Sequence, residues 1–259
     1  LWSTLFGGSA TDYMVGGRVE RTGDIYFAGH TTSPDLPGTA GAAQPHLAGG
    51  HDGYVVKLSK DAKYLRYVTY VGGSKNEFPE HMPLVKNDGS LFLPGVTLSP
   101  DFPTTSGALR NKLKGNSDAF LFGLSPEGDR ALVSTLLGGS AGEFCLMPTP
   151  GPSGEIFIVG QTDSRDLPVT SRALQKEYGG GKSDGWLAAI NSDGSEFSYC
   201  TYLGGSGDDM IRSIAVGSDG ALYLVGNTSS EDFPVTEGAL QTSHRGKGDA
   251  YVVKLAPTR

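Results

Sequence analysis

The sequence predicts an all-β protein, namely a four-bladed β-propeller with four antiparallel strands in each blade. Three markers share one period over the 259 residues: a Gly-Gly-Ser turn, a Thr-x-Ser-x-Asp-(Leu/Phe)-Pro string, and an Asp that opens an apolar run. The Gly-Gly-Ser copies begin at positions 7, 72, 138 and 204, with spacings of 65, 66 and 66 residues. Such a fixed period is typical of repeat architectures. The other two markers begin at Thr31, Thr97, Thr162 and Thr228, and at Asp52, Asp118, Asp184 and Asp249.

Each copy contains four short runs that favour strands. Around the last Gly-Gly-Ser, one run is residues 197–203, which precede it. The other three, residues 211–216, 221–225 and 250–255, follow it. They are rich in Val, Ile, Tyr, Leu and Phe, which strands favour, and Ser-Asp-Gly at 218–220 predicts a tight turn between two of them. No long helical period is present. A four-stranded unit with short hairpins at a fixed period is the pattern of a propeller blade.

The two ends of the chain together have the strand patterns of one complete blade. If the strands of a blade are lettered A to D from the innermost outward, the fourth copy supplies strands A, B and C but no D. Residues 1–6 match the D pattern, so we expect them to pair with residues 250–255 and close the ring, which also removes exposed sheet edges. One domain, 1–259, is then predicted. Its blades are about 12–71, about 77–137, about 143–203, and about 209–255 together with 1–6.

Composition narrows the classes of partner and compartment. The net charge of −7 argues against a nucleic-acid or anionic-membrane partner, and no apolar run approaches a membrane span. The start at Leu1 suggests a processed or excised product.

Cys145 is expected in strand A and Cys200 in strand D of one blade, roughly 14 Å apart at about 4.8 Å per strand. A disulfide between them is therefore excluded by geometry.

The repeat resembles the bacterial SBBP β-propeller repeat family over essentially the whole chain. In the last copy the matching residues are Tyr-Leu-Gly-Gly-Ser at 202–206, Asp-Gly at 219–220, Val-Gly-Asn-Thr at 225–228, Asp-Phe-Pro at 232–234 and the run 249–255. The resemblance implies a propeller that forms part of a secreted or surface protein, and hence an extracytoplasmic location. The family name suggests seven blades against four copies here, so the alternative that the chain is part of a larger ring stays open.

The first candidate site is the face that carries the long loops 31–51, 97–117, 162–183 and 228–248, since function concentrates on long loops of rigid scaffolds. The repeated part of each loop is expected to be structural, with Ser and Asp bonded to local backbone. The loop tips differ between copies and provide a partly basic rim that suits an anionic partner surface; solvated loop charge is the alternative. The predicted binding residues are His46, His51, Arg110, Lys112, Lys114, Lys176, Tyr178, Lys182, His244, Arg245 and Lys247.

The second candidate is a ring of acidic residues, one just after each Gly-Gly-Ser. Because each opens an innermost strand, all four are expected at the mouth of the axis, where calcium or another hard cation would offset their repulsion. The alternative is that each carboxylate accepts hydrogen bonds from its own turn. These residues are Asp12, Glu77, Glu143 and Asp209.

The third candidate is a soft-metal site on the inner strands, where sulfur and imidazole groups gather. Packing is the alternative, since methionine fills irregular gaps well. The residues concerned are Met14, Met82, Met147, Met210, His81 and Cys145.

The function predicted from these features is a non-catalytic binding or scaffold module, a subunit or domain of a larger extracytoplasmic bacterial assembly. Its partner is expected to be a protein or, alternatively, a carbohydrate. No nucleophile elbow, P-loop or zinc-protease motif is present. A polysaccharide hydrolase or lyase with an axial pocket, and a metal-binding or redox accessory protein, stay open as alternatives because a propeller also hosts enzymes.

Overall fold

The computed structural model describes residues 1–256, and these form sixteen strands and no helix. The all-β prediction is confirmed, and within this part of the chain no helix is long and apolar enough to cross a membrane. The chain divides into two compact units, each described by itself. The first comprises residues 1–113 and 119–137, and the second comprises residues 114–118 and the chain from 138 onward.

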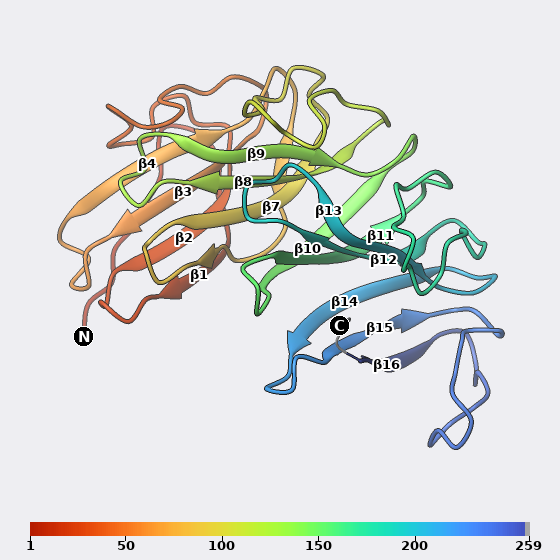
Figure 1. Ribbon diagram of the computed structural model, residues 1–259. Helices are drawn as coiled ribbons and strands as arrows, with labels where there is room; N and C mark the ends of the chain where they lie inside the picture. The colour runs from red at the N-terminus through yellow and green to blue at the C-terminus, as the bar shows by residue number, and fades with distance from the viewer. Residues whose placement is uncertain (257–259) are drawn as a thin grey trace. The chain divides into compact units, whose positions relative to one another are not determined.

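The first unit contains two antiparallel sheets whose strands lie in chain order (Figure 1). The first sheet consists of β1 (Asp12–Val19), β2 (Ile25–Thr31), β3 (Asp52–Leu58) and β4 (Leu65–Val71). The second consists of β5 (Glu77–Pro79), β6 (Leu84–Val85), β7 (Leu91–Thr97), β8 (Asp118–Leu124) and β9 (Ala131–Leu137), with β5 and β6 both paired to β7.

The second unit repeats this arrangement. Its first sheet consists of β10 (Glu143–Pro150), β11 (Ile156–Thr162), β12 (Asp184–Ile190) and β13 (Phe197–Leu203). Its second has three strands, β14 (Asp209–Val216), β15 (Leu222–Thr228) and β16 (Asp249–Leu255). The predicted strand order A-B-C-D is therefore confirmed in the sheets that have four strand positions, and A-B-C in the last.

The turns follow from glycines at fixed places. In the turn between β14 and β15, Gly220 has φ of +77°, and its N–H donates to the Gly217 carbonyl oxygen over 2.9 Å. Gly128 (+77°) and Gly194 (+72°) have the same conformation in the β8–β9 and β12–β13 turns. Glycine adopts this left-handed backbone without the steric cost that a side chain adds, which explains why these three turns end in Gly.

Proline makes the innermost strands irregular. Pro79 ends β5 and Pro83 precedes β6, so strand A of the second sheet is interrupted at residues 80–83. A proline cannot donate to a ladder and is tolerated on an edge strand. The other three innermost strands contain a bulge, for example between Met14 and Gly16 of β1. The innermost strand is thus interrupted in the second sheet and bulged in the other three.

The core of each unit lies between its two sheets. In the first unit, Tyr26 and Val55 of one sheet pack with Phe120 and Leu136 of the other. In the second, Leu187 and Leu203 pack with Ile211 and Leu224. This face-to-face packing of successive sheets is the arrangement of neighbouring blades in a propeller.

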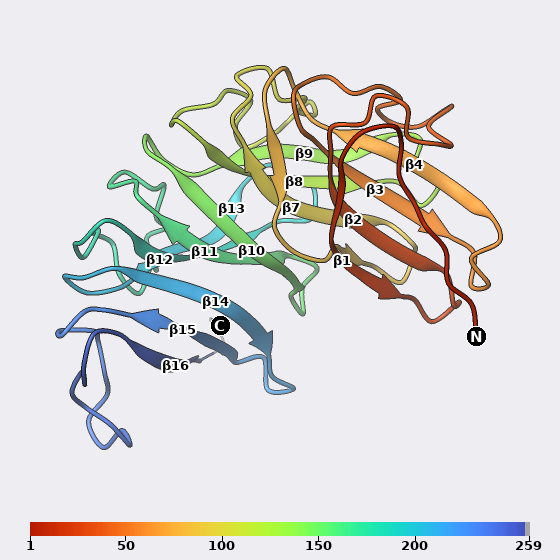
Figure 2. The ribbon, with the colours of Figure 1, turned by 180° about the vertical axis from the view of Figure 1, so that it is seen from behind.

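Closure of the ring by residues 1–6 is not confirmed. β16 pairs with β15 and forms the edge of a three-stranded sheet, and residues 1–6 form no strand. Figure 2 shows this first segment as coil. Phe6 packs instead on Phe27 and Tyr54, with ring centroids 5.3 and 5.8 Å away. The aromatic side chain therefore anchors the segment to the first sheet.

The cysteine prediction is confirmed. Cys145 lies in β10 and Cys200 in β13, which are the two edge strands of one four-stranded sheet. Both thiols are buried and neither forms a disulfide.

Candidate functional site

The repeated motifs build one structural unit at the start of each blade. Ser9 donates to Asp35 Oδ1 through both its N–H (2.8 Å) and its hydroxyl (2.9 Å), and the Ala10 N–H donates to Ser33 Oγ over 2.9 Å. The same bonds recur in the other three copies, with Asp101, Asp166 and Asp232 in place of Asp35. The structural interpretation of the repeated loop residues is confirmed.

The four predicted ion ligands form hydrogen bonds within this same turn at the start of each blade. The Gly8 N–H donates to Asp12 Oδ2 over 2.9 Å, and the Gly73 N–H donates to Glu77 Oε2 over 2.9 Å. Glu143 accepts hydrogen bonds from the hydroxyls of Thr162 and Ser164. Asp209 accepts from the Gly205 N–H (2.7 Å) and Ser230 Oγ (2.6 Å). The alternative role, acceptance of turn hydrogen bonds, is therefore observed, and the cation site stays a prediction.

A second carboxylate lies close to the turns at Gly72 and Gly204, and sequence reasoning did not foresee its role. Asp52, which opens β3, accepts the N–H groups of Ala48 (2.8 Å) and Gly49 (3.0 Å) from its own loop. Asp184 opens β12 in the same way, and burial raises its pKa to about 6, with the nearby Asp209 carboxylate adding to the shift. The constant position of this Asp in the repeat was the signal that it holds a loop.

The structure shows the surroundings of several soft-metal candidates within each unit, and the soft-metal site stays a prediction. Met14 is largely exposed on β1, and the Met82 backbone and Cβ lie close to Gly16. In the other unit, the Met147 sulfur accepts a long contact of 3.6 Å from the Ser213 hydroxyl. Within residues 1–256 no group of three or more His, Cys, Asp or Glu side chains is placed to hold a metal.

The predicted basic residues have different surroundings. Lys114 forms an ion pair with Asp166 over 2.8 Å and thereby lowers the pKa of that carboxyl to about 2. The Arg165 guanidinium lies over the Tyr178 ring, 5.3 Å from its centroid. His46 lines a groove and His51 contacts another imidazole, as described below. The exposed members on their loops are Lys112, Lys176, Lys182, Arg245 and Lys247.

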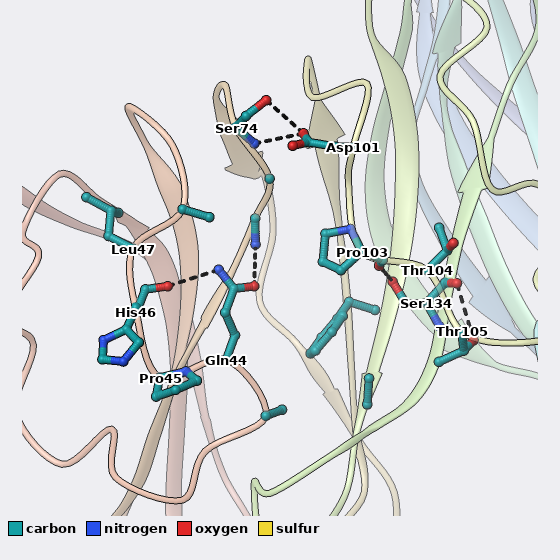
Figure 3. A pocket seen from close by; sticks show the side chains of 16 residues that line it. Gln44, Pro45, His46, Leu47, Ser74, Asp101, Pro103, Thr104, Thr105 and Ser134 are labelled. Atoms are coloured by element: carbon teal, nitrogen blue, oxygen red, sulfur yellow. Dashed lines mark hydrogen bonds between the residues drawn. The ribbon is translucent and has the colours of Figure 1, made fainter.

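The groove beside His46 lies in the first unit and has a volume of about 490 Å³ (Figure 3). One wall is residues 43–48, from the loop between β2 and β3, and the other is residues 103–105, from the loop between β7 and β8. Phe122 of β8 and Ala131 of β9 contribute apolar surface. The volume is typical of ligand sites, which measure about 300–1,000 Å³.

Both walls are held by hydrogen bonds. Gln44 donates from Nε2 to the His46 carbonyl oxygen (3.2 Å) and to Asp52 (3.0 Å), and its Oε1 accepts the Gly72 N–H (3.0 Å). Opposite it, the Ser134 hydroxyl donates to the Pro103 carbonyl oxygen over 2.5 Å. Figure 3 shows the bonds of Gln44 to His46 and Gly72 and the bond of Ser134 to Pro103. The groove is therefore preorganised rather than formed by free loops.

The groove has little catalytic character. Among the described residues that line it, Asp101 is the only carboxylate. It is exposed, and hydrogen bonds from Ser74 lower its pKa. Glycosidases use two carboxyl groups, one of which is held protonated, so this lining does not provide that pair.

A second groove, of about 580 Å³, lies in the other unit near the short turns. It is lined by Glu155 and Phe157 of the β10–β11 region, Tyr199 of β13 and Leu222 of β15. Sequence reasoning missed it because the short turns themselves gave no sign of a hollow between two sheets.

Comparison with known proteins supports the repeat. Residues 199–234 match the model of the SBBP beta-propeller repeat. This segment begins in β13 and contains β14, β15 and the Gly-Gly-Ser turn, which are the elements that the chain repeats. No curated protein matches the chain.

Proposed function

We propose that this SBBP-repeat protein is a non-catalytic binding module that holds an extended segment of a partner protein in the groove between residues 43–48 and 103–105. The observation that carries the proposal is the preorganisation of both walls by Gln44 and Ser134. A rigid groove binds with a smaller loss of conformational entropy than free loops do. In this proposal the chain belongs to a larger extracytoplasmic bacterial assembly.

The lining favours a polypeptide segment over a small charged ligand. Pro45, Leu47, Pro103 and Phe122 present apolar surface, whereas Asp101 is the one carboxylate among the described residues of the lining. Apolar side chains of an extended segment would be buried there, and its backbone would remain at the polar edge formed by Ser74 and Thr104.

The test is co-purification from the native source followed by mass spectrometry, with the wild type compared to Thr104→Arg. The arginine side chain fills the groove. The control is Val235→Arg, because Val235 occupies the same repeat position in the last copy and is exposed. A partner retained by the wild type and the control but lost by Thr104→Arg supports the proposal. We then expect at least about tenfold weaker binding of the purified partner in titration calorimetry, which corresponds to about 1.4 kcal/mol. Equal retention by Thr104→Arg, or no retained partner, contradicts it.

The proposal includes a ring of four blades. Three observations support its closure by residues 1–6. The first is the open edge of β16, where Val252 is 75% exposed although the equivalent Val55 and Leu187 are fully buried. An open, apolar strand edge is a site for strand addition.

The second observation is that residues 1–6 already resemble an outermost strand. The Thr4 hydroxyl donates to the Leu5 carbonyl oxygen over 3.2 Å, as Thr69 does to Tyr70 (3.0 Å) and Thr201 to Tyr202 (2.9 Å). Leu5 is fully exposed, whereas Tyr70 and Tyr202 are buried. Pairing would therefore bury an apolar side chain that is now in water.

The third observation is the loop that accompanies each outermost strand. In the first sheet, the Gln44 N–H donates to Thr69 Oγ1 and the Tyr70 N–H donates to the Gln44 carbonyl oxygen, both over 2.9 Å. In the third copy Gln175 makes the same two bonds. Gln241 is the equivalent residue of the last copy, so Thr4 and Leu5 are its expected partners.

A further inference from the structure

Two histidines of the first unit lie together in an aromatic box. His30 is on β2 and His51 directly precedes β3, and their ring centroids are 5.8 Å apart at an interplanar angle of 56°. Phe78 of β5 contacts both rings, at 5.4 and 5.7 Å. The ring centroid of Tyr13, on β1, lies 4.9 Å from that of His30. The two imidazoles are therefore held by three neighbouring strands and the start of a fourth.

The repeat does not require these histidines. Position by position, His30 corresponds to Val96, Gln161 and Asn227 in the other copies. His51 corresponds to Ser117, Ser183 and Gly248. Both strands form in every copy whatever residue is present, so the pair is specific to this place in the molecule.

Both rings leave a nitrogen without a partner. Nδ1 of His30 and Nδ1 of His51 are buried and make no hydrogen bond. A buried polar atom without a hydrogen-bond partner destabilises the folded protein, so two of them in one box call for an explanation.

The separation of the rings suits coordination of one ion. A metal–nitrogen distance of about 2.0–2.1 Å places the centroids of two imidazoles on one ion about 4.5–6.4 Å apart, from a right-angled to a linear arrangement. The observed 5.8 Å falls in this range, and the 56° angle excludes a stacked pair. Imidazole suits copper, zinc and nickel, and Cu²⁺ binds most tightly of these.

We propose that His30 and His51 form a two-imidazole site for a late first-row transition-metal ion, with Cu²⁺ bound most tightly and the remaining ligand positions taken by water. The site is independent of the proposed partner groove. It also differs from the methionine, His81 and Cys145 set predicted from the sequence, since it contains no sulfur ligand.

The test is titration of untagged protein with Cu²⁺, and separately with Zn²⁺, by calorimetry. We expect one site per chain, bound at least about tenfold more weakly in His30→Gln and in His51→Gln, and lost in the double variant. The matched control replaces the three other histidines, His46, His81 and His244, with Gln and should retain the tight site. Equal affinity in the double variant and the wild type, or loss of the site only in the control, overturns the proposal.

A second measurement uses the wild type alone, so that it does not depend on the folding of the variants. The electron paramagnetic resonance spectrum of the protein with one equivalent of Cu²⁺ should show coupling to two imidazole nitrogens. Coupling to one imidazole nitrogen, or to none, would show that His30 and His51 do not coordinate the ion together, and it would overturn the proposal.

Discussion

Gly73 and Gly205 illustrate how single residues determine the repeat. A Cβ on Gly73 would lie 2.6 Å from the Ser99 Cβ, and one on Gly205 would lie 2.7 Å from the Ser230 Cβ. The serine in each case belongs to the Thr-x-Ser-x-Asp string of the same blade. The second glycine of Gly-Gly-Ser is therefore required by close packing, which links two of the three sequence markers physically.

We predict that Gly73→Ala lowers the free energy of unfolding by about 1–3 kcal/mol, because the added methyl group must displace Ser99 or Asp101. Chemical denaturation measures the change. The control is Gly248→Ala, where the nearest atom to the new Cβ is 3.6 Å away, and it should change stability by less than about 0.5 kcal/mol. Equal stability of the two variants would show that the turn does not have the packing described.

Asp184 makes stability depend on pH. Its folded-state pKa of about 6 lies above the ordinary value of 3.8, so the folded protein binds this proton more tightly than the unfolded chain does. The contribution of Asp184 to stability is therefore largest at low pH and falls as pH rises from about 4 to about 6. In Asp184→Asn this loss should be absent, so the variant gains about 1 kcal/mol relative to wild type across that range, with solvent screening allowed for.

Thermal unfolding at several pH values measures this difference. Asp166→Asn is the control of opposite sign, because Lys114 lowers the pKa of Asp166 to about 2. The stability that Asp166 contributes is present at neutral pH and lost as pH falls from about 4 to about 2. If wild type and Asp184→Asn have parallel stability profiles between pH 4 and 6, burial does not raise the pKa of Asp184 as the structure implies.

At the scale of elements, the long loops run beside the outermost strands and bond to them. Thr105 exchanges backbone and hydroxyl bonds with Ser134 of β9, and Thr170 does the same with Cys200 of β13. The exposed edge of each of these strands is thereby covered, which protects it from pairing with other chains. The loops thus have a structural as well as a binding role.

Ser134→Val should loosen one wall of the groove. The variant keeps the backbone bond from the Thr105 N–H to the residue 134 carbonyl oxygen but removes the hydroxyl bond to Pro103. We expect a loss of about 1 kcal/mol in stability and faster amide exchange at residues 104–105. Hydrogen–deuterium exchange with mass spectrometry checks this, with residues 169–170 of the other unit as the internal reference. Unchanged exchange at 104–105 would mean that the hydroxyl bond does not hold the wall.

The elements were more predictable than the sites. The period of about 66 residues and the strand patterns predicted the sheet order, because each strand carries its own apolar run and turn residues. The carboxylate role of Asp12 and Glu77 followed from their fixed offset after Gly-Gly-Ser. The groove was not predicted, because it joins residues from two blades whose contact depends on packing. The His30–His51 pair was not predicted either, although His51 was expected to bind a partner, because neither histidine recurs in the other copies.

For the whole molecule, the central question is whether four copies of one blade close into a ring. Each unit contains two sheets packed face to face, and the last sheet has an open edge at β16. Residues 1–6 have the residue pattern and the Thr4 hydroxyl bond of an outermost strand. If residues 1–6 close the ring as proposed, the register of the other sheets, where Thr69 faces Val55 and Thr201 faces Leu187, would pair Thr4 with Val252.

The most direct test is a disulfide between Thr4→Cys and Val252→Cys in one chain. Directly opposed residues of antiparallel strands have Cα atoms about 4.5–5.5 Å apart, within the range for a disulfide. The control, Thr4→Cys with Ala250→Cys, is two residues out of register, at about 7–8 Å. Peptide mapping without reduction should find an intramolecular 4–252 bridge in monomeric protein and none in the control. If the first variant forms no bridge, or forms only bridges between chains, residues 1–6 do not close the ring.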